Sequence, residues 1–433
     1  MSRGLGDVYK RQAQGATVVF ELVAPSVQSL GSVTTGIDGT AELILTAGDK
    51  ARTHTVVARL SGDTGESSRI VFNLHVRKAN WSMLLIFGLA GGLGLFLFGL
   101  NMMSKSLQRS AGGRMRAILS ALTVNRFVGV AVGAFVTMVI QSSSATTVML
   151  VSFVQAELMT FAQALGVILG ADIGTTVTAQ LIAFKLTDYA RLLVAVGFGM
   201  RMFGRNSTIK NLGEVILGFG ILFYGMKLMS DAMKPLRTYP DFINVMKGLE
   251  NPLLALLIGA LFTGLIQSSS AFTVIIIVLA QQGLITLVAG IPLVFGANIG
   301  TCITAGLASI GTSREAKRVA LAHVVFKIGG VLLFIFWIPT FADFIHHIAA
   351  KFGSDTALQI ANAHTIFNVS MALIFLPLTT IFAALLLKIM PKEELPKELV
   401  PKIQHLDESM LATPEFAIGL ARKEISRMAK ILG

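Results

Sequence analysis

The pattern of apolar positions divides the chain into three regions of different character. Residues 13–78 alternate apolar and polar positions in short runs, separated by turns rich in glycine and aspartate. This alternation predicts a small β-sandwich domain. Residues 79–390 consist of long apolar runs joined by short basic segments, and residues 391–433 return to a charged, helical pattern. The strands of the first region are expected at 16–24, 41–47, 54–61 and 69–76.

Residues 1–12 fit none of these patterns. They lack the apolar stretch of a signal peptide, although a β-domain outside the cell would need one. We interpret them as a sequencing artefact and expect the natural start of the chain to lie further upstream.

The long apolar runs have the length that a helix needs to cross a bilayer, because about 20 residues span roughly 30 Å. Two runs, 127–155 and 253–282, are interrupted by polar serines. We interpret these two as re-entrant hairpins, which enter and leave the membrane on the same side. The other runs predict crossings at 81–104, 164–185, 190–204, 212–233, 284–308, 319–340 and 357–390.

A sequence repeat relates the two halves of the apolar region. Gln-Ser-Ser-Ser-Ala occurs at 141–145 and at 267–271, and Gly-Ala-Asp/Asn-Ile-Gly-Thr occurs at 170–175 and 296–301. Both pairs have the same offset of 126 positions. A shared apolar composition does not produce matching glutamines, serines, threonines and glycines in one register. The two halves therefore arose by duplication.

Each copy, at about 81–204 and 212–330, contains three predicted crossings and one hairpin, and a final crossing follows at 357–390. An odd number of crossings turns the second copy upside down relative to the first. We therefore predict an α-helical polytopic membrane protein with two inverted repeats and re-entrant hairpins. Many secondary transporters are built in this way and bind their substrate near the middle of the membrane, between the repeats.

Composition and charge agree with a membrane protein. Apolar residues make up 53% of the chain and charged residues only 14%, which is too apolar for an ordinary soluble protein. The net charge of +12 comes largely from basic residues between the apolar runs. Under the positive-inside rule these connections and the C-terminus lie in the cytoplasm, and the β-domain lies outside. Nucleic-acid binding is disfavoured. The single cysteine, Cys302, excludes an internal disulfide and a cysteine-based metal cluster.

The paired serine motifs are the strongest candidates for a substrate site. Polar side chains in a bilayer are unfavourable unless they face protein, water or a ligand. A helix that begins at a hairpin tip offers free backbone N–H groups, which favour an anion, and serine hydroxyls add neutral donors. The predicted site for a multiply charged oxyanion consists of Gln141, Ser142, Ser143, Ser144, Gln267, Ser268, Ser269 and Ser270. The alternative is that the serines only hydrogen-bond packed helices to one another.

The paired glycine-rich segments predict a cation site. Glycines allow a helix to unwind and to free carbonyl oxygens for a hard cation such as sodium, and close helix packing is the alternative interpretation. Asp172 is a carboxylate inside the membrane and a functional candidate for that reason, whereas its counterpart Asn298 is neutral. The predicted sodium ligands are Asp172, Thr175, Thr178, Asn298, Thr301 and Thr304.

The remaining polar residues in the apolar runs receive structural interpretations. Lys327 is expected to pair with another group or to reach the membrane surface rather than to bind the substrate. His323, His364 and Asn368 are interpreted as core hydrogen-bonding residues rather than metal ligands. The sequence contains no nucleophile–base pair and no nucleotide-binding glycine-rich loop. We therefore expect neither an enzyme nor a cofactor.

With these motifs the chain resembles the bacterial branch of the type II sodium–phosphate cotransporter family. The resemblance rests on QSSSATT at 141–147 and QSSSAFT at 267–273, and it extends over about 81–390. It implies sodium-coupled symport of inorganic phosphate by alternating access in the bacterial inner membrane, with the serine motifs in the substrate and sodium sites. Two positions depart from the pattern. Phe272 stands opposite Thr146, and Lys327 stands where asparagine is expected by analogy with Asn368.

Both ends of the chain also resemble known domains. The region 13–78 resembles a bacterial immunoglobulin-like domain through its Asp-Gly-Thr-Ala turn, and 411–433 resembles the first helix of a PhoU-like helical domain. A plain amphipathic helix on the membrane surface is the alternative for the second. A carrier of another oxyanion and a membrane phosphate sensor stay open as other functions. An oligomer is compatible with the sequence, which sets neither the stoichiometry nor the direction of transport.

Overall fold

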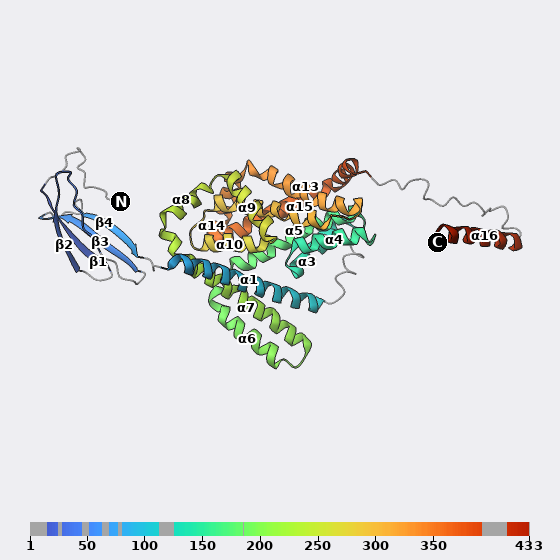
Figure 1. The fold of residues 1–433 in the computed structure, drawn as a ribbon, viewed down its shortest axis with the longest axis horizontal. Coiled ribbons are helices and arrows are strands. Elements are labelled where there is room, and N and C mark those ends of the chain that lie inside the picture. The colour runs from blue at the N-terminus through green and yellow to red at the C-terminus, as the bar shows by residue number, and fades with distance from the viewer. Residues whose placement is uncertain are drawn as a thin grey trace.

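The structure is a computed structural model that describes residues 15–24, 28–45, 52–62, 69–76, 80–111, 125–184, 186–391 and 414–432. Figure 1 shows a small sheet, a large helical body and a separate C-terminal helix, α16 (Pro414–Leu432). The body consists of α1 (Trp81–Ala111), α3 (Arg126–Ile140), α4 (Ser143–Gln155), α5 (Phe161–Ala183), α6 (Ala190–Phe203), α7 (Ser207–Met233), α8 (Pro240–Gly248), α9 (Pro252–Ile266), α10 (Ser269–Gln281), α11 (Leu287–Gly300), α12 (Cys302–Ala308), α13 (Arg314–Ile335), α14 (Ile338–Phe352) and α15 (Thr356–Ile389), with short 3-10 turns at Thr187–Tyr189 and Lys234–Thr238.

The N-terminal sheet is antiparallel and has the strand order β2-β1-β3-β4. Its strands are β1 (Thr17–Ala24), β2 (Gln28–Thr34), β3 (Arg52–Leu60) and β4 (Arg69–Val76). The strand predicted at 41–47 is wrong, because residues 41–45 are irregular, and β2 was not predicted. The described residues contain only this one sheet, without the second sheet of a sandwich.

The Asp-Gly-Thr-Ala turn precedes the irregular segment. Asp38 Oδ2 accepts a hydrogen bond of 2.7 Å from the Thr40 hydroxyl, and Oδ1 accepts one of 3.1 Å from the Thr40 N–H. These bonds favour the ionised carboxylate, so they lower the pKa of Asp38 below its usual value. Gly39 follows with a φ of +71°, a left-handed conformation that glycine adopts easily.

The helix boundaries confirm the duplication. The first residues of α7, α9, α10 and α11 each lie 126 positions after those of α1, α3, α4 and α5. The last residues of α3 and α4 have the same offset from those of α9 and α10. A single register therefore governs the elements themselves as well as the motifs within them.

Contacts between α1 and α7 show directly that the two copies are inverted. A Cβ on Gly92 would lie 2.7 Å from the carbonyl oxygen of Gly225, and one on Gly99 would lie 2.5 Å from that of Gly218. The two helices are therefore antiparallel. In the second copy, the counterpart of Gly92 is Gly218 and the counterpart of Gly99 is Gly225. Each of the two contacts is therefore the repeat equivalent of the other, as expected for two copies related by a two-fold axis.

The hairpins are re-entrant, as predicted. Gly166 lies against Arg126, and Gly174 lies against Ala134, so α3 and α5 run parallel. Helix α4 ends only a short turn before α5 begins, on the side where α3 begins. The chain of α3 and α4 thus returns to the side from which it entered. In the second copy, α9, α10 and α11 repeat this arrangement, with Gly296 against Leu256.

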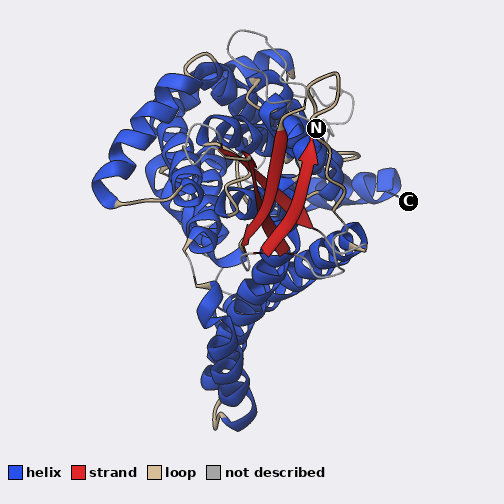
Figure 2. Ribbon diagram, turned by 90° about the vertical axis from the view of Figure 1, so that its left-hand side faces the viewer, coloured by secondary structure: helices blue, strands red, loops and turns tan. Residues whose placement is uncertain are grey.

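Among the described residues, six segments are long and apolar enough to cross a membrane, namely α1, α5, α7, the α11–α12 pair, α13 and α15. The crossing predicted at 190–204 is too short. There, α6 has 14 residues, or about 21 Å, against a hydrocarbon core of about 30 Å. Figures 1 and 2 show α6 and α7 extending together away from most of the other helices. The counterpart of α6 in the second copy, α13, instead packs inside the body, against α4, α5 and α15.

Candidate functional site

Each hairpin reverses direction at the glutamine of its serine motif. Gln141 has φ 60° and ψ 24°, and Gln267 has φ 58° and ψ 25°. This left-handed conformation is uncommon for a residue other than glycine and is unfavourable by about 1–3 kcal/mol. The strain occurs at the same position in both copies, so surrounding contacts must hold each turn in place.

Those contacts come from the glutamine side chains. In Gln141, the Nε2 group donates to the carbonyl oxygen of Met138, and Oε1 accepts a 2.6 Å hydrogen bond from Thr178. In Gln267, Nε2 donates to the carbonyl oxygen of Gly264, and Oε1 accepts a 2.7 Å hydrogen bond from Thr304. A primary amide is suited to this position because it donates and accepts at once. Each hairpin tip is therefore tied to the crossing helix of its own repeat.

The first serine of each motif caps the returning helix. Ser142 accepts a 3.2 Å hydrogen bond from the N–H of Ala145, and Ser268 accepts one of the same length from Ala271. Helices α4 and α10 therefore both begin at the turns, with their N-terminal ends beside the remaining serines. Helix N-termini carry a partial positive charge that favours anions.

The two hairpin tips converge on one cavity of about 230 Å³. Its lining includes all eight predicted substrate-binding residues, so the structure joins two motifs that are far apart in the sequence. The lining residues are Leu97, Leu100, Asn101, Ser104, Ile140, Gln141, Ser142, Ser143, Ser144, Gln267, Ser268, Ser269 and Ser270. None of these lining side chains is ionised. The cavity thus offers hydroxyls, amides and helix N-termini, which can bind a small oxyanion without a buried arginine.

Sequence reasoning missed the contribution of α1 to this cavity. Asn101 and Ser104 line it, and the Ser104 hydroxyl donates a 2.6 Å hydrogen bond to the carbonyl oxygen of Ile140, at the end of α3. The available signal was a pair of polar positions one turn apart near the end of an apolar run. Their counterparts on α7, Lys227 and Ser230, are not lining residues. The cavity is consequently asymmetric.

The predicted cation segments are not unwound. Helix α5 continues through 170–175, and in the second copy only Thr301 interrupts the helix between α11 and α12. The prediction of a helix break is therefore wrong for the first copy, and in the second copy the break is limited to one residue. The glycines allow close packing instead, because a Cβ on Gly170 would lie 2.0 Å from the carbonyl oxygen of Val130. Gly296 has the same relation to Leu256, at 2.1 Å.

The six predicted sodium ligands form three kinds of contact rather than one site. Thr178 and Thr304 bind the glutamines, as described. Thr175 donates to the carbonyl oxygen of Ala171 at 3.1 Å, and Thr301 donates to that of Asn298 at 2.6 Å. Asp172 and Asn298 both contact Lys327, with each Oδ1 atom 2.6 Å from the lysine Nζ. The expectation that Lys327 pairs is thus confirmed.

The family of the chain can be decided from comparisons with known proteins. A family model described as Na+/Pi-cotransporter matches residues 95–231 and 241–358, more than half of the chain. The chain belongs to the Na+/Pi-cotransporter family. Both serine motifs and both glycine-rich segments lie inside the matched ranges. The family assignment therefore covers the cavity and the contacts around Lys327.

Several curated proteins are similar to the chain. An uncharacterized protein of Bacillus subtilis, YqeW, is 33% identical over 71% of the chain and 99% of its own length. The putative inorganic phosphate export protein YjbB of Escherichia coli is 31% identical over 80% of the chain and 63% of its own length. The human sodium-dependent phosphate transport protein 2B is 34% identical over 29% of the chain and 20% of its own length. The chain thus spans less than two thirds of the Escherichia coli relative. No solved structure matches.

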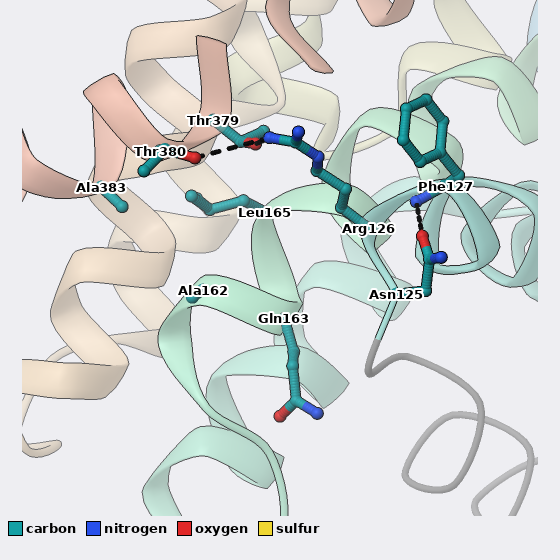
Figure 3. Close-up of a pocket in the computed structure, with 9 residues that line it drawn as sticks. All are labelled: Asn125, Arg126, Phe127, Ala162, Gln163, Leu165, Thr379, Thr380 and Ala383. Carbon is teal, nitrogen blue, oxygen red and sulfur yellow. Dashed lines mark hydrogen bonds between the residues drawn. The ribbon is translucent and has the colours of Figure 1, made fainter. Parts of the chain in front are cut away.

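This member of the Na+/Pi-cotransporter family has a second pocket, of about 630 Å³, at the start of α3 and α5 (Figure 3). Arg126 spans it and donates 3.4 Å hydrogen bonds to Thr379 and Thr380 of α15. The pocket contains neither serine motif, and nothing in the repeat pattern indicated it. The smaller cavity is the better candidate for the substrate, because both repeats contribute equivalent residues to it.

Proposed function

We propose that this protein couples the movement of inorganic phosphate across the bacterial inner membrane to sodium, with phosphate bound between the two hairpin tips. The single observation that carries the proposal is the convergence of both Gln-Ser-Ser-Ser motifs on one cavity of about 230 Å³. A phosphate ion there would receive hydrogen bonds from hydroxyls and backbone N–H groups of both repeats. The β-domain would lie outside the cytoplasm and the C-terminus inside.

The proposed transport cycle is alternating access between the two repeats. It is supported by an asymmetry between otherwise equivalent turns. Gln141 is buried, with 5% of its surface exposed, whereas Gln267 is exposed. Two inverted copies can exchange such environments, so that the cavity opens first on one side of the membrane and then on the other.

Sodium coupling is proposed from the names of the mammalian relatives and from the oxygen-rich hairpin tips. The hydroxyls of Thr178 and Thr304 donate to the glutamines, and each keeps lone pairs that can face a hard cation. We place sodium beside these two threonines. Asp172 and Asn298 are a separate case, because Lys327 contacts both.

Uptake of radiolabelled phosphate into proteoliposomes tests the proposal. We expect an inward sodium gradient to drive accumulation, and an equal potassium gradient to drive none. Uptake that ignores sodium would contradict the coupling, and competition by sulfate as strong as that by phosphate would point to another oxyanion. Binding of phosphate without uptake would instead support a sensor.

Export of phosphate is a second candidate, because the Escherichia coli relative carries the name of a putative export protein. The same vesicles, loaded with labelled phosphate, distinguish the two directions. Efflux that is faster than uptake at equal and opposite sodium gradients would favour export.

A further inference from the structure

Lys327 lies where the two glycine-rich segments meet. Its side chain is 4% exposed. Its Nζ atom is 2.6 Å from Oδ1 of Asp172 on α5 and 2.6 Å from Oδ1 of Asn298 on α11. Asp172 and Asn298 are equivalent residues of the two inverted repeats. One lysine therefore contacts the same position in both copies.

The second repeat supplies this cation. The counterpart of Lys327 in the first copy is Arg201, on α6. It is half-exposed and forms an ion pair with Glu214 of α7, near the turn that joins the two helices. The structural reason is the different position of the equivalent helices, since α13 packs inside the body and α6 packs mainly on α7.

Neighbouring aromatic side chains hold the elements around the lysine in place. Phe295 on α11 contacts Phe367 on α15, with ring centroids 4.2 Å apart. Phe334 on α13 contacts Phe367 at 5.1 Å. The helices that carry Asn298 and Lys327 are thus packed against a common partner. The lysine position is built into the core.

The contacts of Lys327 are those of a bound cation. A buried carboxylate is unfavourable without a compensating charge. Carboxylate and amide oxygens are also ligands that hard metal cations prefer, and an ammonium group is a compact point charge. Its Nζ atom therefore takes a place that a sodium ion would otherwise suit.

We propose that Lys327 is a tethered cation that replaces sodium between Asp172 and Asn298, so that this position binds no sodium ion in the native protein. The inference rests on the proposed function only in that sodium is a co-substrate at all. It assigns the coupling sodium to the hairpin tips and gives Asp172 a structural charge partner instead of a transported one.

Removal of the lysine charge should convert the position into a sodium site. In Lys327→Met the side chain keeps its approximate length, and Asp172 is left without a counter-charge. We expect the melting temperature of purified Lys327→Met protein to rise by several degrees more in sodium chloride than in choline chloride, relative to wild type. The double variant Asp172→Asn/Lys327→Met, which has no uncompensated charge, should lose this extra rise. Equal sodium effects in all three proteins would overturn the proposal.

A second measurement covers the case in which Lys327→Met does not fold. The number of sodium ions bound per protein is measured by equilibrium binding of ²²Na⁺ to wild type and to the double variant. We expect equal numbers, because the native position holds no sodium. A loss of one bound sodium ion in the double variant would show that Asp172 is a sodium ligand. Neither readout depends on phosphate movement, so failure of the proposed function would appear separately in the proteoliposomes.

Discussion

The turn at Gln141 and the turn at Gln267 have the same geometry, whereas the residues behind them have diverged. Both turns share the left-handed glutamine, the threonine hydrogen bond and the serine cap. Behind the first turn, the Thr146 hydroxyl lies 2.8 Å from that of Thr137. Behind the second, Phe272 replaces the threonine. The turns have kept the same geometry in both copies, whereas the residues behind them differ. The hairpin tips are therefore the part of the cavity that the two copies share.

The divergence has a consequence for Thr263, the counterpart of Thr137. Phe272 stacks on Phe262 with ring centroids 5.6 Å apart. Among the described residues, the Thr263 hydroxyl is buried and has no hydrogen-bond partner. The second copy has therefore exchanged a hydrogen bond for an aromatic contact. Equivalent substitutions in the two copies can test each of these similarities and differences.

The largest loss of stability is expected where the copies are most alike, at the glycines where two helices pack closely against each other. In Gly170→Ala, the new Cβ would lie 2.0 Å from the carbonyl oxygen of Val130, and α3 would have to move away from α5. We expect a loss of about 3 kcal/mol in the free energy of unfolding. Gly296→Ala should have a similar effect. Thermal melting in detergent measures both. Gly199→Ala is the control, because nothing lies near its Cβ, and equal losses at all three positions would contradict the packing argument.

An intermediate effect is expected at the threonines that hold the turns. Thr178→Val leaves Gln141 Oε1 without its donor, which we expect to reduce stability by about 1–3 kcal/mol. Thr304→Val should reduce it less, because water can reach the exposed Gln267. Chemical denaturation of both variants gives the two values. A larger loss for Thr304→Val would contradict the difference in exposure between the two turns.

The smallest effect should have opposite signs in the two copies. Thr137→Val removes the partner of Thr146 and should reduce stability by about 1 kcal/mol. Thr263→Val removes a buried hydroxyl that has no partner, so it should be neutral or stabilising by about 1 kcal/mol. Melting curves of the two variants, measured side by side, decide the point. Equal destabilisation would mean that the two threonines have equivalent surroundings after all.

Much of the fold could be predicted from the sequence because repetition and apolar length are local signals. The offset of 126 positions located the helices of the second copy, and the polar interruption at Gln141 located the first turn. The crossing at 190–204 was mispredicted because apolar character does not show that this short run extends away from the other helices together with α7. The glycines at 170–175 were misread as a break because sequence alone does not show which backbone approaches them.

The site could be predicted only in part, for a similar reason. The serine motifs could be recognised in the sequence because they are repeated, and the structure brings them into one cavity. Asn101 and Ser104 have no repeated counterpart in the cavity, so the repeat does not mark them, and the packing of α1 is what places them there. The joint contact of Lys327 with Asp172 and Asn298 also depends on tertiary packing, because residues from three separate helices meet there.

Equilibrium binding of ³²P-labelled phosphate to the purified protein tests the proposed cavity most directly. The variants are Ser143→Ala and Ser269→Ala, one in each hairpin tip. Ser152→Ala is the matched control, because this serine lies on α4, is not among the cavity-lining residues, and donates its hydroxyl hydrogen bond to the carbonyl oxygen of Val148. We expect each cavity variant to weaken phosphate binding about tenfold or more, since a hydrogen bond to a charged group contributes about 1.5–3 kcal/mol. The control should bind as wild type does. Wild-type affinity in both cavity variants would contradict the assignment of the phosphate site.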